Sequence, residues 1–177
     1  MKKLLFIVLF LHVSAVSASP VLAAEDVYQT PESFVAESFD ETAPPARSLT
    51  IQGELKNKVA KIMGSHYKLP SVKYWQKNGR TVWILEDIGK FEPITTGYVV
   101  GPGGTLERTK VLVYRESHGW EVKHEFFTRQ FKGAGLKREK KLDQRIDGIA
   151  GATLSVDALK RMGALALTLH KEVQSAP

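Results

Sequence analysis

The feature that most constrains the fold of this 177-residue chain is a long apolar helical pattern at residues 153–172. Apolar residues recur there at steps of three and four, which is the spacing of one broad helix face. Other parts of the chain must cover such a face. The pattern therefore predicts a long helix that packs against the core, in preference to a helix lying on a membrane surface. The predicted face consists of Leu154, Ala158, Leu159, Met162, Leu165, Ala166 and Leu169.

Four segments rich in β-branched and aromatic residues precede that helix, and they form two pairs. Residues 72–76 and 81–86 flank the dipeptide Asn78-Gly79, which is a strong signal for a tight β-hairpin. Residues 94–100 and 106–115 flank a second glycine-rich turn. The sequence therefore predicts an antiparallel sheet of about four to five strands.

Three further segments carry helical patterns, at residues 31–39, 48–63 and 123–131. The segment at 48–63 is expected to be capped by Ser48 and to stop at Gly64. Strands and helices are thus segregated along the chain. We expect an α+β fold with one domain, in which an antiparallel sheet packs against helices and a long C-terminal helix.

The first 24 residues have the organisation of a secretory signal peptide. A basic start with Lys2 and Lys3 is followed by an apolar stretch at residues 4–13 and by small residues suited to cleavage. We expect cleavage and a periplasmic or other extracytoplasmic location, with a retained N-terminal anchor as the alternative. The remaining chain is expected to divide into a lead-in segment and linker at 25–47, one domain at 48–172 and a C-terminal tail at 173–177.

Composition narrows the chemistry open to the chain. It contains no cysteine, which excludes thiolate-bound iron–sulfur clusters, dithiol redox motifs and c-type haem attachment. Any electron transfer must then use an organic cofactor. His118 and His124 lack acidic or cysteine partners at ligand spacing, so no metal site is expected.

The formal net charge is +6, so the chain is only mildly basic. No dense basic run is interleaved with aromatic residues, so nucleic acid is not an expected partner. Basic residues gather at 132–145, together with Glu139 and Asp143. This tract is either a solvated face or a docking surface for an acidic redox partner.

The segment at residues 147–155 leads into the predicted long helix and contains Gly148 and Gly151. Thr153 lies where the helix is expected to begin. A helix N-terminus presents unpaired N–H groups and a positive dipole end, which suit a phosphate. The Thr153 hydroxyl therefore has two interpretations: it caps the helix, or it carries a phosphate-linked group.

This segment resembles the flavinylation motif Asp-x-x-(Ser/Thr)-Gly-Ala-Thr of the FMN-binding domain family. Asp147, Gly151, Ala152 and Thr153 match the motif, whereas Ala150 stands where the family usually carries Ser or Thr. Relatives in this family include components of two membrane complexes, the sodium-pumping NADH:quinone reductase and the Rnf electron-transfer complex.

Two upstream segments extend the resemblance. Residues 116–120 are similar to the family's Glu-Thr-Pro-Gly loop, and residues 126–133 are similar to the segment that follows it. The three landmarks occur in the family's order, and the resemblance covers about residues 50–170.

The resemblance implies an FMN held covalently by a phosphoester to Thr153, which an FMN transferase of the ApbE type attaches. It implies an exported electron carrier, rather than a stand-alone enzyme with catalytic residues of its own. Such a carrier would relay electrons between two partners. One is a membrane reductase, which is the implied membrane redox partner, and the other is an extracytoplasmic acceptor. The implied cofactor-binding residues are Thr153, Asp147, Gly148, Gly151, Ala152, Leu154, Ser155, Glu116 and Trp120.

Several alternatives remain open. Glu116 either bonds to the flavin or caps a neighbouring loop, and Trp120 either stacks on the flavin ring or belongs to the core. Because Ala150 lacks the usual hydroxyl, the chain could also be a non-redox periplasmic binding or regulatory module in which Thr153 is an unmodified N-cap. Non-covalent flavin binding is a third possibility.

Overall fold

The computed structural model describes residues 26–40, 42–65, 67–138 and 140–175. The expected signal peptide lies outside these residues. The main sheet contains β1 (Asp26–Val27), β2 (Arg47–Thr50), β3 (Ser71–Lys77), β4 (Arg80–Ile88), β5 (Pro93–Val100) and β6 (Leu106–Tyr114). The helices are α1 (Pro31–Ser38), α2 (Gly53–Met63), α3 (Glu125–Thr128) and α4 (Thr153–Ser175). The short 3-10 helices η1 (Trp120–Lys123) and η2 (Arg129–Phe131) flank α3, and β7 (Leu136–Lys137) and β8 (Lys141–Leu142) form a separate small hairpin.

The six strands of the main sheet lie in the order β1-β6-β5-β4-β3-β2, and every neighbouring pair is antiparallel. Both predicted hairpins are present. Asn78 and Gly79, with φ of 52° and 77°, form the tight turn between β3 and β4, as expected for a two-residue hairpin turn. The α+β class and the antiparallel sheet are confirmed, and the edge strands β1 and β2 bring the main sheet to six strands where four to five were predicted.

The predicted helix over residues 48–63 begins later than expected. Residues 47–50 form the edge strand β2, in which Ser48 lies opposite Lys73 of β3, and α2 starts only at Gly53. Ser48 therefore does not cap a helix. Leu49 and Ile51 fit a period of two as well as a helical period, and the hydrogen-bonded ladder with β3 decides between them. The predicted stop at Gly64 is confirmed by its φ of 93°.

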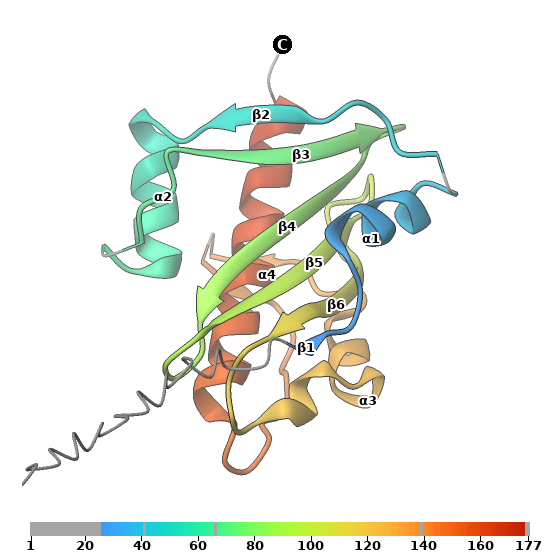
Figure 1. Ribbon diagram of the computed structural model, residues 1–177. Coiled ribbons are helices and arrows are strands. Elements are labelled where there is room, and N and C mark those ends of the chain that lie inside the picture. The colour runs from blue at the N-terminus through green and yellow to red at the C-terminus, as the bar shows by residue number, and fades with distance from the viewer. Residues whose placement is uncertain (1–25, 41, 66, 139, 176–177) are drawn as a thin grey trace, which may run out of the picture.

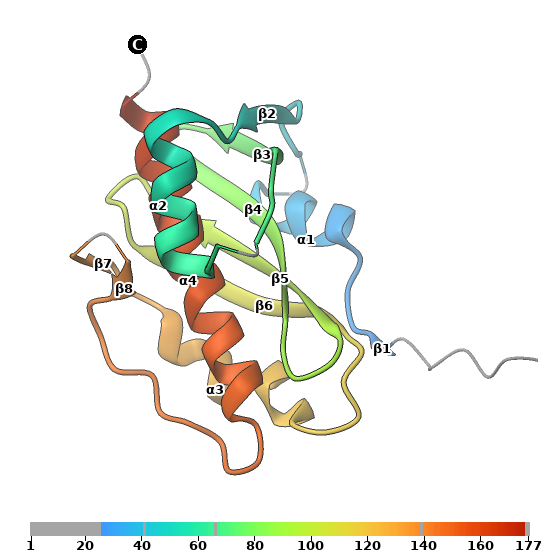
Figure 2. The same cartoon turned by 90° about the vertical axis from the view of Figure 1, so that its left-hand side faces the viewer.

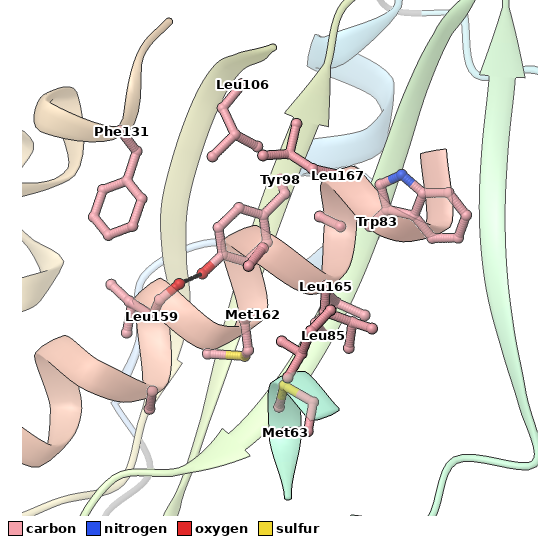
Figure 3. Close-up of a cluster of buried hydrophobic side chains, with 14 of the residues drawn as sticks. Met63, Trp83, Leu85, Tyr98, Leu106, Phe131, Leu159, Met162, Leu165 and Leu167 are labelled. Carbon is pink, nitrogen blue, oxygen red and sulfur yellow. Dashed lines mark hydrogen bonds between the residues drawn. The ribbon is translucent and has the colours of Figure 1, made fainter. Parts of the chain in front are cut away.

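Helices α2 and α4 cover one face of the sheet (Figures 1 and 2). Except for Leu154, all the residues of the predicted apolar face of α4 are buried, so the prediction of a core-packing helix is confirmed. Figure 3 shows the centre of this core, where the Tyr98 hydroxyl donates to the Leu159 carbonyl oxygen at 2.8 Å. This contact fixes α4 against β5.

Helix α1 covers the opposite face of the sheet (Figure 2). Its Phe34 is fully buried and lies directly over Gly97 of β5, where an added Cβ would approach the Phe34 ring to 2.4 Å. The N-terminal strand β1 pairs with the end of β6. The lead-in segment predicted at 25–47 thus contributes a strand and a helix to the packed structure.

The predicted helix at 123–131 is formed by η1, α3 and η2 in succession. After the β7–β8 hairpin, the chain runs alongside α4 and turns back into its start (Figure 2). Among the described residues, no helix is long and apolar enough to cross a membrane.

Candidate functional site

Three segments meet around the start of α4 and enclose a cleft of about 410 Å³. The β4–β5 loop contributes Lys90 and Phe91, and the loop after β6 contributes Ser117 and His118. The structure thus brings together segments that are far apart in the sequence, from the β4–β5 loop to the first turn of α4. Six of the predicted site residues line this cleft: Glu116, Gly151, Ala152, Thr153, Leu154 and Ser155.

Thr153 is the first residue of α4, not the residue that caps it. The Ala152 carbonyl oxygen accepts the first helical hydrogen bond, from the Val156 N–H at 2.9 Å, so Ala152 occupies the N-cap position. Thr153 is exposed, and within the described part of the chain its hydroxyl makes no hydrogen bond. Of the two interpretations of Thr153, the capping one is therefore not what the structure shows, and its hydroxyl is available to another molecule.

The start of α4 also offers backbone donors. Because the first helical bond is donated by Val156, the N–H groups of Thr153, Leu154 and Ser155 have no partner within the helix. The helix is 23 residues long, and its dipole places partial positive charge at this end. The cleft therefore combines a free hydroxyl with a local environment that favours an anion.

Tyr114 holds two walls of the cleft together, a role that no local sequence pattern indicates. It ends β6, and its ring is buried. Its hydroxyl donates to the His118 carbonyl oxygen at 2.5 Å and lies 3.2 Å from Ser155 Oγ. Burial raises the pKa of the Tyr114 phenol above its usual value, which keeps the hydroxyl protonated for these contacts.

Gly119 permits the loop after β6 to reach the start of α4. Its φ of 80° is in the left-handed region, which disfavours residues with a Cβ. An added Cβ would lie 2.9 Å from Ala152 Cβ and 3.1 Å from the Tyr114 hydroxyl. Gly119 therefore satisfies two requirements at once, for backbone conformation and for close packing.

Glu116 binds the β4–β5 loop. Its Oε1 accepts hydrogen bonds from the backbone N–H groups of Lys90, Phe91 and Glu92, with 2.7 Å to Phe91 and 3.0 Å to Glu92. Burial opposes the charged carboxylate, but these backbone donors outweigh burial and lower the pKa of Glu116. Of the two roles that the sequence allowed for Glu116, loop capping is the one seen in the structure.

Phe91 and Leu154 give the cleft an apolar lining that is open to solvent. Their exposed fractions are 71% for Phe91 and 49% for Leu154. The Lys90 ammonium lies 4.8 Å from the centre of the Phe91 ring. Phe91 was not among the predicted site residues. The only local signal is an aromatic residue between Gly89 and Pro93, in the segment that joins two predicted strands.

The remaining predicted residues lie outside the cleft lining. Asp147 is exposed, forms an ion pair with Arg145 at 3.0 Å, and donates its backbone N–H to Gln130 Oε1. Gly148 follows it in the same exposed loop. Trp120 is the first residue of η1 and is 49% exposed. Its ring packs edge-on against His124, and it does not line the cleft.

Among the described residues, no group of three or more His, Asp or Glu side chains is placed to hold a metal ion.

Residues 89–168 match the family model of the FMN-binding domain. The matched range contains every residue that lines the cleft. It confirms the resemblance read from the sequence and supports FMN binding by this part of the chain. No curated protein matches the chain.

Proposed function

Because the chain carries an FMN-binding domain at residues 89–168, we propose that it is an electron-transfer flavoprotein with one FMN held by a phosphoester to Thr153. The observation that carries this proposal is the Thr153 hydroxyl. It is exposed, free of hydrogen bonds within the described part of the chain, and located at the N-terminus of a long helix beside a cleft.

The attachment is a phosphoryl transfer. Thr153 Oγ1 forms a new bond to the phosphorus of an FMN donor, and the bond from that phosphorus to the donor's leaving group breaks. The hydroxyl proton departs with the leaving group or with a base of the transferase. The chain then gains the mass of FMN less one water. No electrons are exchanged in this step.

The residues around Thr153 fit an FMN. The free N–H groups at the start of α4 suit the phosphate, and the exposed side chains of Phe91 and Leu154 offer apolar surface for the planar ring system. Volumes of roughly 300–1,000 Å³ are usual for small-molecule sites, and this cleft is about 410 Å³. A bound FMN supplies the one- and two-electron chemistry, while the chain holds, orients and partly shields it.

We further propose that the flavoprotein is exported and relays electrons between a membrane reductase and an extracytoplasmic acceptor. The signal-like N-terminus supports export. The absence of cysteine leaves an organic cofactor as the means of moving electrons. A covalent tether suits an exported carrier, because a dissociated FMN would be diluted outside the cell.

The deciding experiment is intact-mass analysis of the denatured protein, produced for export with and without an FMN transferase of the ApbE type. We expect a transferase-dependent gain of one FMN less one water, located on Thr153 by fragmentation. Thr153→Val should abolish the gain, whereas Thr153→Ser, which retains a hydroxyl, should keep it at least in part. An unmodified mass beside an active transferase would reject the phosphoester and favour the non-redox module.

A further inference from the structure

A second, basic cleft of about 540 Å³ lies along α4 beyond the cofactor site. It is bounded by the end of α2, the chain from β8 to residue 146, and the first half of α4. Six basic side chains line it: Lys61, Lys140, Lys141, Arg145, Lys160 and Arg161. Its apolar floor is formed by Ile62, Leu142 and Ile146, of which Ile62 and Ile146 are buried.

Three of the six cations already have carboxylate partners. Lys160 Nζ lies 3.3 Å from Asp157, Arg161 contacts the buried Asp87 at 2.7 Å, and Arg145 pairs with Asp147. For the other three, Lys61, Lys140 and Lys141, the described residues provide no ion pair, and all three side chains are exposed. Within the described part of the chain, these three lysines leave the basic cleft with positive charge that no carboxylate pairs.

The β7–β8 hairpin extends the positive surface. A neighbouring hollow of about 720 Å³ is lined by the same hairpin and adds Lys137 and Arg138. The acidic residue of this hollow, Asp143, is engaged by the chain itself, since its carboxylate accepts a hydrogen bond from the Gly135 N–H at 2.8 Å. Glu139 lies outside the described residues.

We propose that the basic cleft docks an acidic segment of a partner protein. Charge complementarity selects carboxylates as the contacting groups. The buried apolar floor favours a polypeptide that carries apolar side chains between its acidic ones, because a flat lipid surface would reach only the rim. The six cations come from three separate segments of the chain, which suits an extended segment better than a single small anion.

The basic cleft lies close to the proposed cofactor site, as electron transfer to a docked partner requires. Lys160 follows Thr153 by seven residues on the same helix, which is about 10 Å along the helix axis. A partner seated in the basic cleft would therefore lie beside the cofactor site. The docking proposal does not rest on the phosphoester, because no residue of the basic cleft lines the cofactor cleft.

The test uses the protein without flavin and a fluorescein-labelled peptide of alternating glutamate and leucine, followed by fluorescence anisotropy. A peptide with glutamine in place of glutamate is the first control. We expect the glutamate peptide to bind, the glutamine peptide not to bind, and added salt to weaken binding. Lys140→Glu with Lys141→Glu should weaken binding about tenfold, because the reversal replaces two attractive contacts with two repulsive ones.

The matched variant is Lys73→Glu with Lys77→Glu. These exposed lysines of β3 undergo the same charge change away from the basic cleft, and the affinity should be retained. An equal loss of affinity in both double variants would mean that net charge alone governs binding. Equal binding of the glutamate and glutamine peptides would mean that carboxylates are not recognised. Either result overturns the proposal. It is also overturned if vesicles of phosphatidylglycerol bind through Lys140 and Lys141 while the glutamate peptide does not bind.

Discussion

The hydroxyl of Tyr114 lies 3.2 Å from the hydroxyl of Ser155, at the point where the last strand of the sheet meets the first turn of α4. The same phenol donates to the His118 carbonyl oxygen. One buried side chain thus fixes the helix start relative to the loop after β6. Because Thr153 lies two residues before Ser155, the position of the proposed tether depends on this contact.

We expect Tyr114→Phe to lower the free energy of unfolding by about 1–2 kcal/mol, because it leaves the His118 carbonyl and Ser155 hydroxyl without a partner. Urea denaturation measures this loss. Tyr67→Phe is the matched control, since the Tyr67 hydroxyl donates to the Glu86 carbonyl at the surface. A loss in Tyr114→Phe no larger than in the control would contradict the role given to Tyr114.

Gly119→Ala should destabilise the protein by about 2 kcal/mol or more, since it adds a steric clash to the cost of a left-handed backbone. The added Cβ would meet Ala152 at 2.9 Å. Gly133→Ala separates the two effects, because Gly133 has a φ of 84° but open space around its Cβ position. Thermal unfolding of both variants should show a clearly lower Tm for Gly119→Ala; equal shifts would rule out the clash.

Phe34→Ala should cost about 3–5 kcal/mol, as is usual for removing a buried phenylalanine. Phe34 is fully buried against Gly97 on the outer face of the sheet. The measurement is the free energy of unfolding from urea titration, with Glu32→Ala, an exposed position on the same helix, as the control. If Phe34→Ala were as stable as the control, α1 would be a dispensable lead-in and not part of the fold.

The parts of the fold that could be predicted are those with strong local signals. Asn78-Gly79 specifies its hairpin turn regardless of what surrounds it, and the apolar face of α4 repeats over several turns. Edge strand β2 was missed because Leu49 and Ile51 are compatible with two periodicities. Only pairing with β3, some 25 residues away, selects the strand.

The residues of the site likewise differ in whether a local sequence pattern indicates them. Thr153 was found because its motif is contiguous in the sequence, and Glu116 because it opens a second recognisable loop. Tyr114, Gly119 and Phe91 act through contacts with segments that are distant in the chain. A single sequence does not encode those distances in any local pattern.

Glu116→Gln should lower the Tm at neutral pH, because it removes the charge that strengthens three backbone hydrogen bonds to the β4–β5 loop. The lowered pKa of Glu116 sets the pH dependence. The carboxylate stabilises the folded protein above the unfolded pKa of 4.5, and this contribution is lost as pH falls through the lower folded pKa. The Tm difference between wild type and variant should therefore narrow below pH 4.5; a constant difference would contradict this role.

His170 gives the protein a second pH dependence, in a higher range. The ring is buried, and its Nδ1 lies 2.8 Å from Thr81 Oγ1, which itself accepts a hydrogen bond from Trp83 Nε1 at 2.8 Å. The Thr81 hydroxyl can donate to a neutral imidazole, so this arrangement satisfies all three groups without a charge. Burial lowers the pKa of His170 from 6.5.

The direction in which the free energy of unfolding changes with pH follows from proton binding at His170. Below about pH 6.5 the unfolded chain takes up a proton at His170 that the folded protein resists, so the free energy of unfolding should decrease as pH falls from 6.5 towards the folded pKa. The slope from one such group is at most about 1.4 kcal/mol per pH unit, and it vanishes above the unfolded pKa. Urea denaturation between pH 8 and 5 measures it. His170→Gln should flatten this slope, whereas an unchanged slope in the variant would assign the pH dependence to other groups.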